Sequence, residues 1–338
     1  MNILELIRPN IRQMAPYSTA RDEYQGGDID VWVDANENPY NNGVNRYPDP
    51  HQKALKAVLS GIKNMPVDQI FVGNGSDEAI DLMFRIFCRP GVDNAVSMAP
   101  SYGMYSVAAE TNDVEFRPVQ LNADYTLDTD RMLAACDENT KLMWVCSPNN
   151  PTGNAFPLSQ IEELAERFHG ILVVDEAYVD FTTDSLLNGG LQRHENVVVL
   201  QTLSKAWGMA GLRLGLAFAS PLIIGYMSRV KYPYNVNGPT QETVMKRLAN
   251  NVTAQVEEIK KQREMLLAEL PKVACVKTVF PSDANFILIR VEDADATYDR
   301  LIAAGIIVRN RNRVKGCEGC LRLTVGTPEE NKRLLETL

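Results

Sequence analysis

The sequence is poor in the residues that build metal sites and disulfide frameworks, with three histidines and six cysteines among 338 residues. Cys317 and Cys320 have CxxC spacing, but no second CxxC follows, and the histidines are scattered at His51, His169 and His194. A zinc site needs about four such ligands close together. We therefore expect no metal, and a loop with two unpaired thiols in a chain large enough to fold without disulfides.

The sequence also lacks a basic run and a long apolar run. The formal net charge is −9, which argues against a nucleic-acid partner, although a few arginines in a cleft could still bind an anionic small substrate. No apolar stretch reaches the length of a membrane span, and the first apolar stretch is interrupted by charges, unlike a secretory signal. We expect a cytoplasmic protein that contacts neither nucleic acid nor membrane.

Short apolar runs alternate with helical patterns between about residues 69 and 220. The runs cover 69–73, 94–99, 141–147, 171–176, 196–202 and 214–220, and helical stripes occur at 76–87 and 159–169. Such alternation is typical of a mostly parallel sheet with crossover helices. The pattern predicts an α/β fold with a central sheet flanked by helices.

The remainder of the chain predicts a second, smaller unit. A long helical stretch begins near Asn237 and ends at Pro271. Strands at 284–291, 305–310 and 320–326, with a helix at 294–304, follow it. We expect an N-terminal arm with part of the small domain at 1–47, a large domain at 48–236, and a linking helix with a small α/β domain at 237–338. The arm is expected to pack on one of these units or on another subunit.

Four of the apolar runs end in polar or glycine-rich clusters. QIFVG continues into NGSDE, KLMWVC into SPNNPTG, ILVV into DEAY, and NVVVLQ into TLSK. Each cluster alone is typical of a turn or a helix cap. In open α/β sheets, however, ligands bind at the carboxyl ends of the strands. Together the four clusters predict a ligand site at that edge.

The segment GNGSDEAI places glycines at a strand end and Ser76 and Asp77 at the start of a helix. Free backbone N–H groups at a helix start bind phosphate, and a simple side-chain cap is the other interpretation. No GK[ST] follows, and the spacing is not GxGxxG, so neither a Walker loop nor a dinucleotide fingerprint is indicated.

Lys205 lies in the apolar, glycine-rich stretch TLSKAWGMAGLRLG. It could be a surface lysine, an ion-pair partner or an amine that forms a Schiff base. Its neighbours favour the third interpretation, because Thr202, Ser204 and Arg213 could bind a phosphate. Asp175, at the end of a strand expected to be buried, could pair with the pyridinium nitrogen of pyridoxal phosphate.

SPNNPTG, VVDEAY and TLSKAWGMAGLRLG, in that order, resemble the motifs of fold-type I pyridoxal-phosphate-dependent aminotransferases. The closer resemblance is to the histidinol-phosphate aminotransferase family, whose motifs are similar to DANENPY, RYPDP, GNGSDEAID, APSYGMY and GCLRLTVGTPEE. The resemblance covers nearly the whole chain and implies pyridoxal 5′-phosphate as cofactor and a homodimer with shared active sites.

The resemblance implies a role for each matching residue. Lys205 would carry the cofactor as a Schiff base and act as the catalytic base, Asp175 would keep the ring nitrogen protonated, and Tyr178 and Asn150 would contact the ring hydroxyl. Tyr102 would stack on the ring. The cofactor phosphate would be bound by Gly75, Ser76, Asp77, Thr202, Ser204, Arg213 and the partner subunit's Tyr47.

The resemblance also implies substrate-binding residues. Arg322 would take the substrate carboxylate, and Arg309, Tyr17 and Asn36 would surround the substrate phosphate. Arginine suits both tasks because its planar fork binds such anions with two hydrogen bonds. RNRNR at 309–313 is equally typical of a solvated charged face, so both interpretations of Arg309 stay open.

The implied reaction transfers an amino group between L-histidinol phosphate and 2-oxoglutarate, giving imidazole-acetol phosphate and glutamate, in histidine biosynthesis. Two enzymatic alternatives keep Lys205 and Asp175: an aromatic amino acid aminotransferase and a decarboxylase acting on threonine phosphate. A non-enzymatic alternative is a pyridoxal-phosphate-binding regulator. Such regulators carry a DNA-binding domain ahead of the aminotransferase body, and the NENP segment beginning at Asn36 is expected to leave no room for one.

Overall fold

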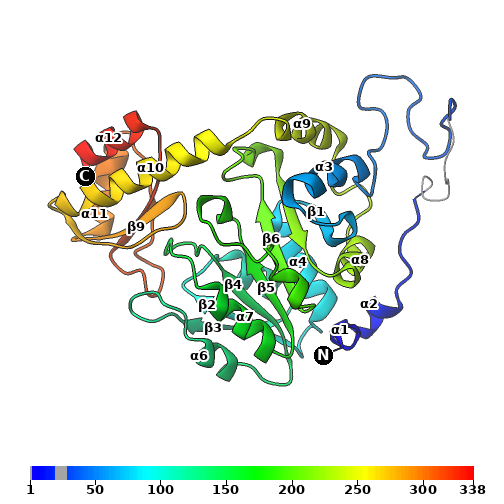
Figure 1. Cartoon of the computed structure of the whole chain (residues 1–338), viewed down its shortest axis with the longest axis horizontal. Coiled ribbons are helices and arrows are strands. Elements are labelled where there is room, and N and C mark those ends of the chain that lie inside the picture. Colours follow the sequence, from blue (N-terminus) through cyan, green and yellow to red (C-terminus); the bar gives the residue numbers. More distant parts are fainter. Residues whose placement is uncertain (1, 20–28) are drawn as a thin grey trace.

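Two separate β-sheets organise the chain in the computed structural model, which describes residues 2–19 and 29–338 (Figure 1). The larger sheet has seven strands in the order β1-β7-β6-β5-β4-β2-β3. Strands β2 to β6 pair in parallel, whereas β7 pairs antiparallel with β1 and β6. The predicted mostly parallel sheet is confirmed. Its strands are β1 (Ile70–Asn74), β2 (Asn94–Ala99), β3 (Glu115–Gln120), β4 (Thr140–Cys146), β5 (Ile171–Asp175), β6 (Val197–Thr202) and β7 (Leu214–Phe218).

Helices cover both faces of this sheet, which explains why its central strands are almost continuously apolar. Alternate residues of β5 belong to opposite cores: Val173 faces one, and Leu172 and Val174 face the other. The first core includes α4 (Ser76–Phe87), α5 (Met104–Thr111) and α8 (Pro221–Val230). The second includes α3 (Lys53–Lys63), α6 (Thr129–Ala134), α7 (Leu158–Arg167) and α9 (Gly238–Leu248).

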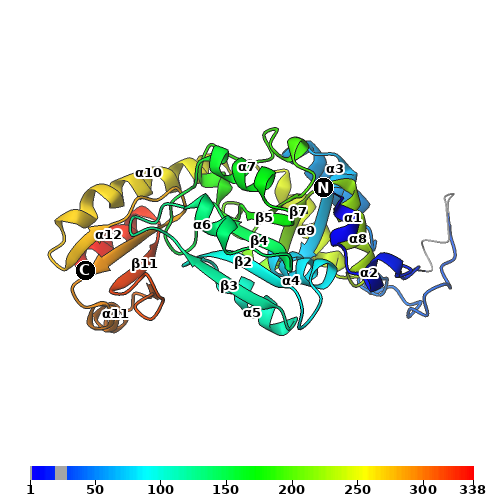
Figure 2. The ribbon, with the colours of Figure 1, turned by 90° about the horizontal axis from the view of Figure 1, so that it is seen from below.

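The smaller sheet is antiparallel, with the order β10-β11-β9-β8. Its strands are β8 (Val276–Val279), β9 (Phe286–Val291), β10 (Arg309–Asn310) and β11 (Cys320–Thr324). A third core joins this sheet to α10 (Thr253–Glu269), α11 (Ala294–Ala303) and α12 (Pro328–Thr337). Figure 2 shows this unit beside the large sheet, with α10 running along it. The strand expected at 305–310 is formed only by its last two residues.

The helical stretch predicted to run from Asn237 to Pro271 is broken. Helix α9 ends at Leu248 and α10 begins at Thr253. Asparagine favours local side-chain hydrogen bonds over a helix interior. Asn250 and Asn251 lie in the break between the two helices. There the carboxamide oxygen of Asn251 accepts a 2.7 Å hydrogen bond from the Thr253 amide at the start of α10.

The start of the arm packs differently from the expectation that residues 1–47 include part of the small domain. Helices α1 (Ile3–Leu6) and α2 (Pro9–Gln13) and the turn between them insert Ile3, Ile7 and Ile11 into the core beside α4 and α8. The arm therefore begins on the large sheet, far from the small one (Figures 1 and 2), because these isoleucines find apolar cover there. Residues 29–52 form no helix or strand. Across 2–19 and 29–338, no helix is long and apolar enough to cross a membrane.

Candidate active site

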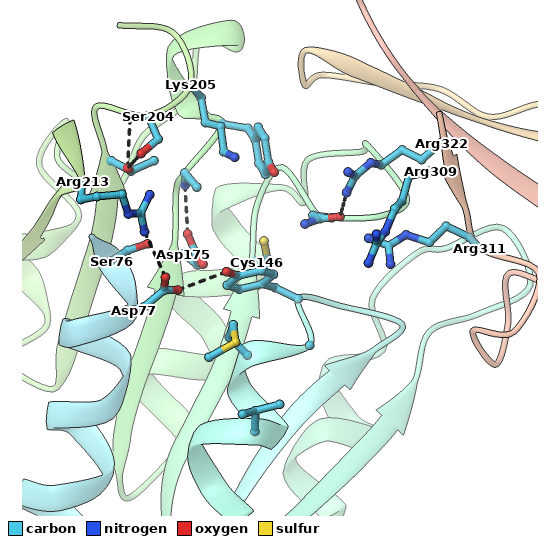
Figure 3. A pocket seen from close by; sticks show the side chains of 18 residues that line it. Ser76, Asp77, Cys146, Asp175, Ser204, Lys205, Arg213, Arg309, Arg311 and Arg322 are labelled. Atoms are coloured by element: carbon cyan, nitrogen blue, oxygen red, sulfur yellow. Dashed lines mark hydrogen bonds and ion pairs between the residues drawn. The ribbon is translucent and has the colours of Figure 1, made fainter. Parts of the chain in front are cut away.

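One cavity of about 580 Å³ opens where the carboxyl ends of the large-sheet strands meet the small sheet. The ends of β1, β4, β5 and β6 lie at the same edge, as the four polar clusters predicted. Figure 3 shows the side chains that line it. They include these residues singled out from the sequence: Ser76, Asp77, Tyr102, Asn150, Asp175, Tyr178, Thr202, Ser204, Lys205, Arg213, Arg309 and Arg322.

Asp175 ends β5 at the floor of this cavity and is buried. Its Oδ2 atom accepts a 2.6 Å hydrogen bond from the Tyr105 hydroxyl, and its Oδ1 atom accepts one from the Ala177 amide at 3.0 Å. Burial raises the pKa of this carboxyl group, and the two hydrogen bonds oppose that shift. A cation placed against Asp175 from the cavity would favour its ionised form.

Lys205 lies in the loop after β6, and its side chain points into the cavity (Figure 3). The ammonium nitrogen lies 5.5 Å from the centre of the Tyr178 ring, and no described residue accepts a hydrogen bond from it. Burial, followed by the Arg322 guanidinium, lowers the pKa of this amine, although Asp175 opposes the shift. A lysine with a lowered pKa is a better nucleophile and base near neutral pH.

The start of α4 lies open at the cavity. Gly75 is the N-cap residue, with φ of 80°, and no side chain caps the first turn, so the interpretation of Ser76 or Asp77 as a simple cap is wrong. A Cβ atom on Gly75 would come within 2.7 Å of Arg213 Nη2. A Cβ atom on Gly215 in β7 would come within 2.1 Å of the Ser76 amide nitrogen. The two glycines thus allow β7 and Arg213 to approach a helix start whose N–H groups can bind an anion.

Hydroxyl groups and a guanidinium surround that helix start. Arg213 Nη2 lies 3.3 Å from Asp77 Oδ2, and the Thr202 hydroxyl donates a 3.0 Å hydrogen bond to Ser204 Oγ. The Tyr102 hydroxyl donates to the same Asp77 carboxylate at 3.1 Å. The guanidinium and the hydroxyl groups, together with the open turn of α4, are donors that could bind a phosphate group.

Arg322 reaches across from β11 to the opposite wall. Its Nη1 atom donates a 2.5 Å hydrogen bond to Asn150 Oδ1, and its guanidinium lies 5.1 Å from the Phe286 ring centre. Arg309 in β10 is directly opposite Arg322 in the ladder, so both side chains lie on the face that lines the cavity. The small sheet therefore contributes cations at the side away from Arg213 (Figure 3).

Three predicted residues lie outside the cavity, on the N-terminal arm. Tyr17 is 72% exposed, and Asn36 is also exposed. The Tyr47 ring stacks on Tyr234 with centres 4.4 Å apart and planes 14° apart. A single chain does not bring these residues to Lys205.

Sequence reasoning missed Tyr105 and Arg311. Tyr105 is in the first turn of α5, three residues after Tyr102, which precedes the helix. It lies beneath the cavity, with its ring stacked on that of Trp144 at a distance of 4.8 Å between centres. Arg311 follows Arg309 by two residues and lines the cavity with it. The alternation of a strand in RNRNR was the available signal for Arg311. Tyr105 stands among apolar residues in the sequence, which indicates burial. That pattern is equally typical of an ordinary core residue of a helix, so it does not predict a contact with Asp175.

The cavity fits pyridoxal phosphate, the cofactor that the resemblance implies. It offers a lysine with a lowered pKa, a buried carboxylate and an open helix start rimmed by hydroxyls, all from one chain. In pyridoxal phosphate, the lysine would react with the aldehyde, the carboxylate would pair with the pyridinium nitrogen, and the helix start would bind the phosphate. Within 2–19 and 29–338 no group of three or more histidine, cysteine or acidic side chains could hold a metal ion.

Comparison with known families and structures agrees with this chemistry. Residues 20–338 match the family model of aminotransferase class I and II. A histidinol-phosphate aminotransferase of Parabacteroides distasonis is 50% identical over 339 residues, covering 100% of this chain and 98% of that protein. One of Bacteroides thetaiotaomicron is 50% identical over 336 residues, covering 99% and 97%.

The fold is also that of solved structures. The crystal structure of a histidinol-phosphate aminotransferase from Sinorhizobium meliloti in complex with pyridoxal 5′-phosphate aligns with a TM-score of 0.79. The two chains are 23% identical, and the alignment covers 87% of this chain and 82% of the other.

Proposed function

Because the chain belongs to the class I and II aminotransferases, we propose how its own residues transfer an amino group between L-histidinol phosphate and 2-oxoglutarate. It is a pyridoxal-phosphate-dependent enzyme of fold type I, acting in histidine biosynthesis, and its products are imidazole-acetol phosphate and glutamate. The observation that carries the proposal is the placement of Lys205, Asp175 and the open start of α4 around one cavity.

Bound pyridoxal phosphate supplies an aldehyde carbon that reacts with amines and a protonated ring that accepts electrons. Asp175 is the residue that would keep the ring nitrogen protonated, since its carboxylate is buried and aimed into the cavity. Asn150 and Tyr178 would contact the ring hydroxyl, and Tyr102 would stack on the ring. The start of α4 at Gly75, Ser76 and Asp77, together with Thr202, Ser204 and Arg213, would bind the phosphate.

Lys205 is proposed as both the anchoring amine and the general base. Its Nζ atom would take the proton from the substrate carbon that bears the amino group and deliver it to the C4′ position of the cofactor, and would move a proton the opposite way in the reverse half-reaction. Its lowered pKa favours the neutral amine that this task requires. The apolar Tyr178 and Phe286 rings, 5.0 Å apart, would limit the access of water to it.

The substrate anions would bind on the small-sheet side. Arg322 would take a substrate carboxylate, and Arg309 would contact the substrate phosphate with Tyr17 and Asn36. The hydrogen bond that Arg322 donates to Asn150, a residue proposed to contact the ring hydroxyl, supports this assignment.

A homodimer would complete the site. Tyr17, Asn36 and Tyr47 lie outside the cavity of their own chain, and Val31, Val33, Tyr40 and Val44 on the same arm are exposed. In such a dimer the arm of each chain would pack on the other chain. The partner's Tyr47 would then reach the cofactor phosphate. Mixing Lys205→Ala and Tyr47→Ala subunits tests this, because only a shared site makes the mixture more active than the two variants measured separately. The homodimer and the cytoplasmic location stay predictions.

Steady-state rates with L-histidinol phosphate, phenylalanine and threonine phosphate test the reaction. The proposal expects the first to react far faster, with 2-oxoglutarate as acceptor. Faster transamination of phenylalanine would identify an aromatic amino acid aminotransferase. Release of carbon dioxide from threonine phosphate would identify a decarboxylase.

A further inference from the structure

Three arginines project from one face of the small sheet into the cavity. Arg309 and Arg322 are direct partners in the β10–β11 ladder, and Arg311 follows Arg309 by two residues. The Arg311 amide donates a 2.9 Å hydrogen bond to the Cys320 carbonyl, which extends the pairing with β11 by one step. Asn310, between the two arginines, donates instead to Asp295 of α11. Alternation along the strand thus turns Arg309 and Arg311 to the side of Arg322 (Figure 3).

Arg311 has no anionic partner among the residues that the structure describes. It forms no ion pair and no side-chain hydrogen bond there, and its Nε atom is buried without an acceptor. Arg309 likewise forms no ion pair with a described residue. Arg322 has only the neutral Asn150 oxygen, and its Nε atom is also buried without an acceptor. Arg309 is exposed, whereas Arg311 and Arg322 are partly buried. For these two, a guanidinium without a full set of acceptors is destabilising unless a ligand supplies them.

Mutual repulsion adds to this cost. Burial, and then the Arg322 and Arg309 charges, lower the pKa of Arg311. The pKa of Arg322 is lowered as well, chiefly by burial and also by the Arg309 charge. Arg213 and the start of α4, where the cofactor phosphate would bind, lie on the far side of Lys205 (Figure 3). The three arginines therefore form a second cationic region, open to the substrate.

We propose that Arg311 is a substrate-binding residue that, with Arg309, takes the distal phosphate of the substrate and favours it over a carboxylate. This rests on the proposed function. A phosphate monoester carries nearly two negative charges at neutral pH and three acceptor oxygens, enough for two guanidinium groups. A carboxylate has two oxygens, which one guanidinium fork can satisfy. Removal of the Arg311 side chain should therefore weaken the binding of a phosphorylated substrate more than the binding of glutamate.

The test compares Arg311→Gln with Arg313→Gln in the holoenzyme. Arg313 is the matched control, because it is exposed, lies two residues further along and does not line the cavity. We expect Arg311→Gln to lower kcat/KM for L-histidinol phosphate roughly 10- to 100-fold, mainly through KM, since a charge-assisted hydrogen bond is lost. The value for glutamate should change less than about threefold, and Arg313→Gln should match the wild type. Equal losses for both substrates, or none, would overturn the inference.

Two further measurements keep the inference separate from folding defects and from the proposed function. Arg311→Lys retains the charge without the fork, so it should fold as the wild type and lose part of the preference for phosphate. If the wild-type enzyme does not turn over L-histidinol phosphate, the proposed function fails. Inhibition of the glutamate half-reaction by inorganic phosphate then still tests Arg311. Inorganic phosphate should inhibit Arg311→Gln less strongly than Arg313→Gln. Equal inhibition of the two variants would overturn the inference.

Discussion

The Tyr105 hydroxyl lies 2.6 Å from Asp175 Oδ2, and both side chains are buried beneath the cavity. Tyr105 also stacks on Trp144, so its ring is fixed by packing and its hydroxyl by the carboxylate. Asp175 therefore has a fixed orientation toward the cavity before any ligand binds. Tyr105 is a positioning residue, since it acts through Asp175.

The Tyr105→Phe variant should weaken cofactor binding while keeping the fold. The phenyl ring retains the stacking, but Asp175 loses a hydrogen bond that lowers its pKa, so its ionised form becomes less favoured. We expect a loss of about 1–3 kcal/mol in the free energy of cofactor binding, measured by titrating the apoenzyme with pyridoxal phosphate.

Tyr125→Phe is the matched control for that variant. Tyr125 is also buried, and its hydroxyl donates a 2.7 Å hydrogen bond to the Gly316 carbonyl, outside the cavity. It should lower the free energy of unfolding without changing cofactor affinity. Equal cofactor affinity in Tyr105→Phe and the wild type would contradict the positioning role.

The Gly75→Ala variant should impair the phosphate site. Alanine at φ of 80° and ψ of 164°, a region that essentially only glycine adopts, costs about 1–3 kcal/mol. Its Cβ atom would also come within 2.7 Å of Arg213 Nη2, so the arginine would have to move. We expect roughly tenfold weaker cofactor binding, since about 1.4 kcal/mol corresponds to that factor. Gly61→Ala, in α3 with open space around it, should instead stabilise the helix by about 0.5–1 kcal/mol. Unchanged cofactor affinity in Gly75→Ala would remove this loop from the phosphate site.

The charge of Arg322 should set the pH dependence of Lys205. Burial is the largest cause of the lowered pKa of the Lys205 amine, and the Arg322 guanidinium is the second largest. Removing this positive charge makes protonation of the amine easier, so its pKa rises. In Arg322→Gln the rate of pyridoxal phosphate incorporation into apoenzyme should reach half its maximum at a higher pH than in the wild type.

Arg322→Lys keeps a positive charge at the same position and serves as the control for this pH shift. Its profile should lie near that of the wild type, although the bidentate fork is lost. A shift of Arg322→Gln to lower pH, or an equal shift in both variants, would show that charge is not the cause.

Much of the large domain could be predicted because its local patterns agree with its long-range packing. Helix α4 begins at Ser76 and ends at Phe87, as its stripe of apolar residues indicates. The edge strands β3 and β8 escaped prediction because they are only partly buried and lack an apolar alternation. Pro118 within β3 is tolerated because that strand lies at the edge of its sheet.

The candidate site was predictable where a motif follows a strand, and less so where packing decides. Asp175 ends β5 and Lys205 follows the end of the neighbouring strand β6 by three residues, so the sheet brings them together. The contact of Tyr105 with Asp175 spans 70 residues and depends on how α5 packs on the sheet. Arg311 reaches the cavity only because β10 pairs with β11 in one particular register.

Borohydride reduction of the holoenzyme, followed by peptide mass spectrometry, identifies the residue that carries the cofactor. Of the described residues that line the cavity, Lys205 is the only lysine. We predict that reduction bleaches the absorption band of the cofactor and leaves a pyridoxyl group on Lys205, and that Lys205→Ala has neither the band nor the modified residue. A pyridoxyl group on another lysine, or an unchanged band in Lys205→Ala, would contradict it.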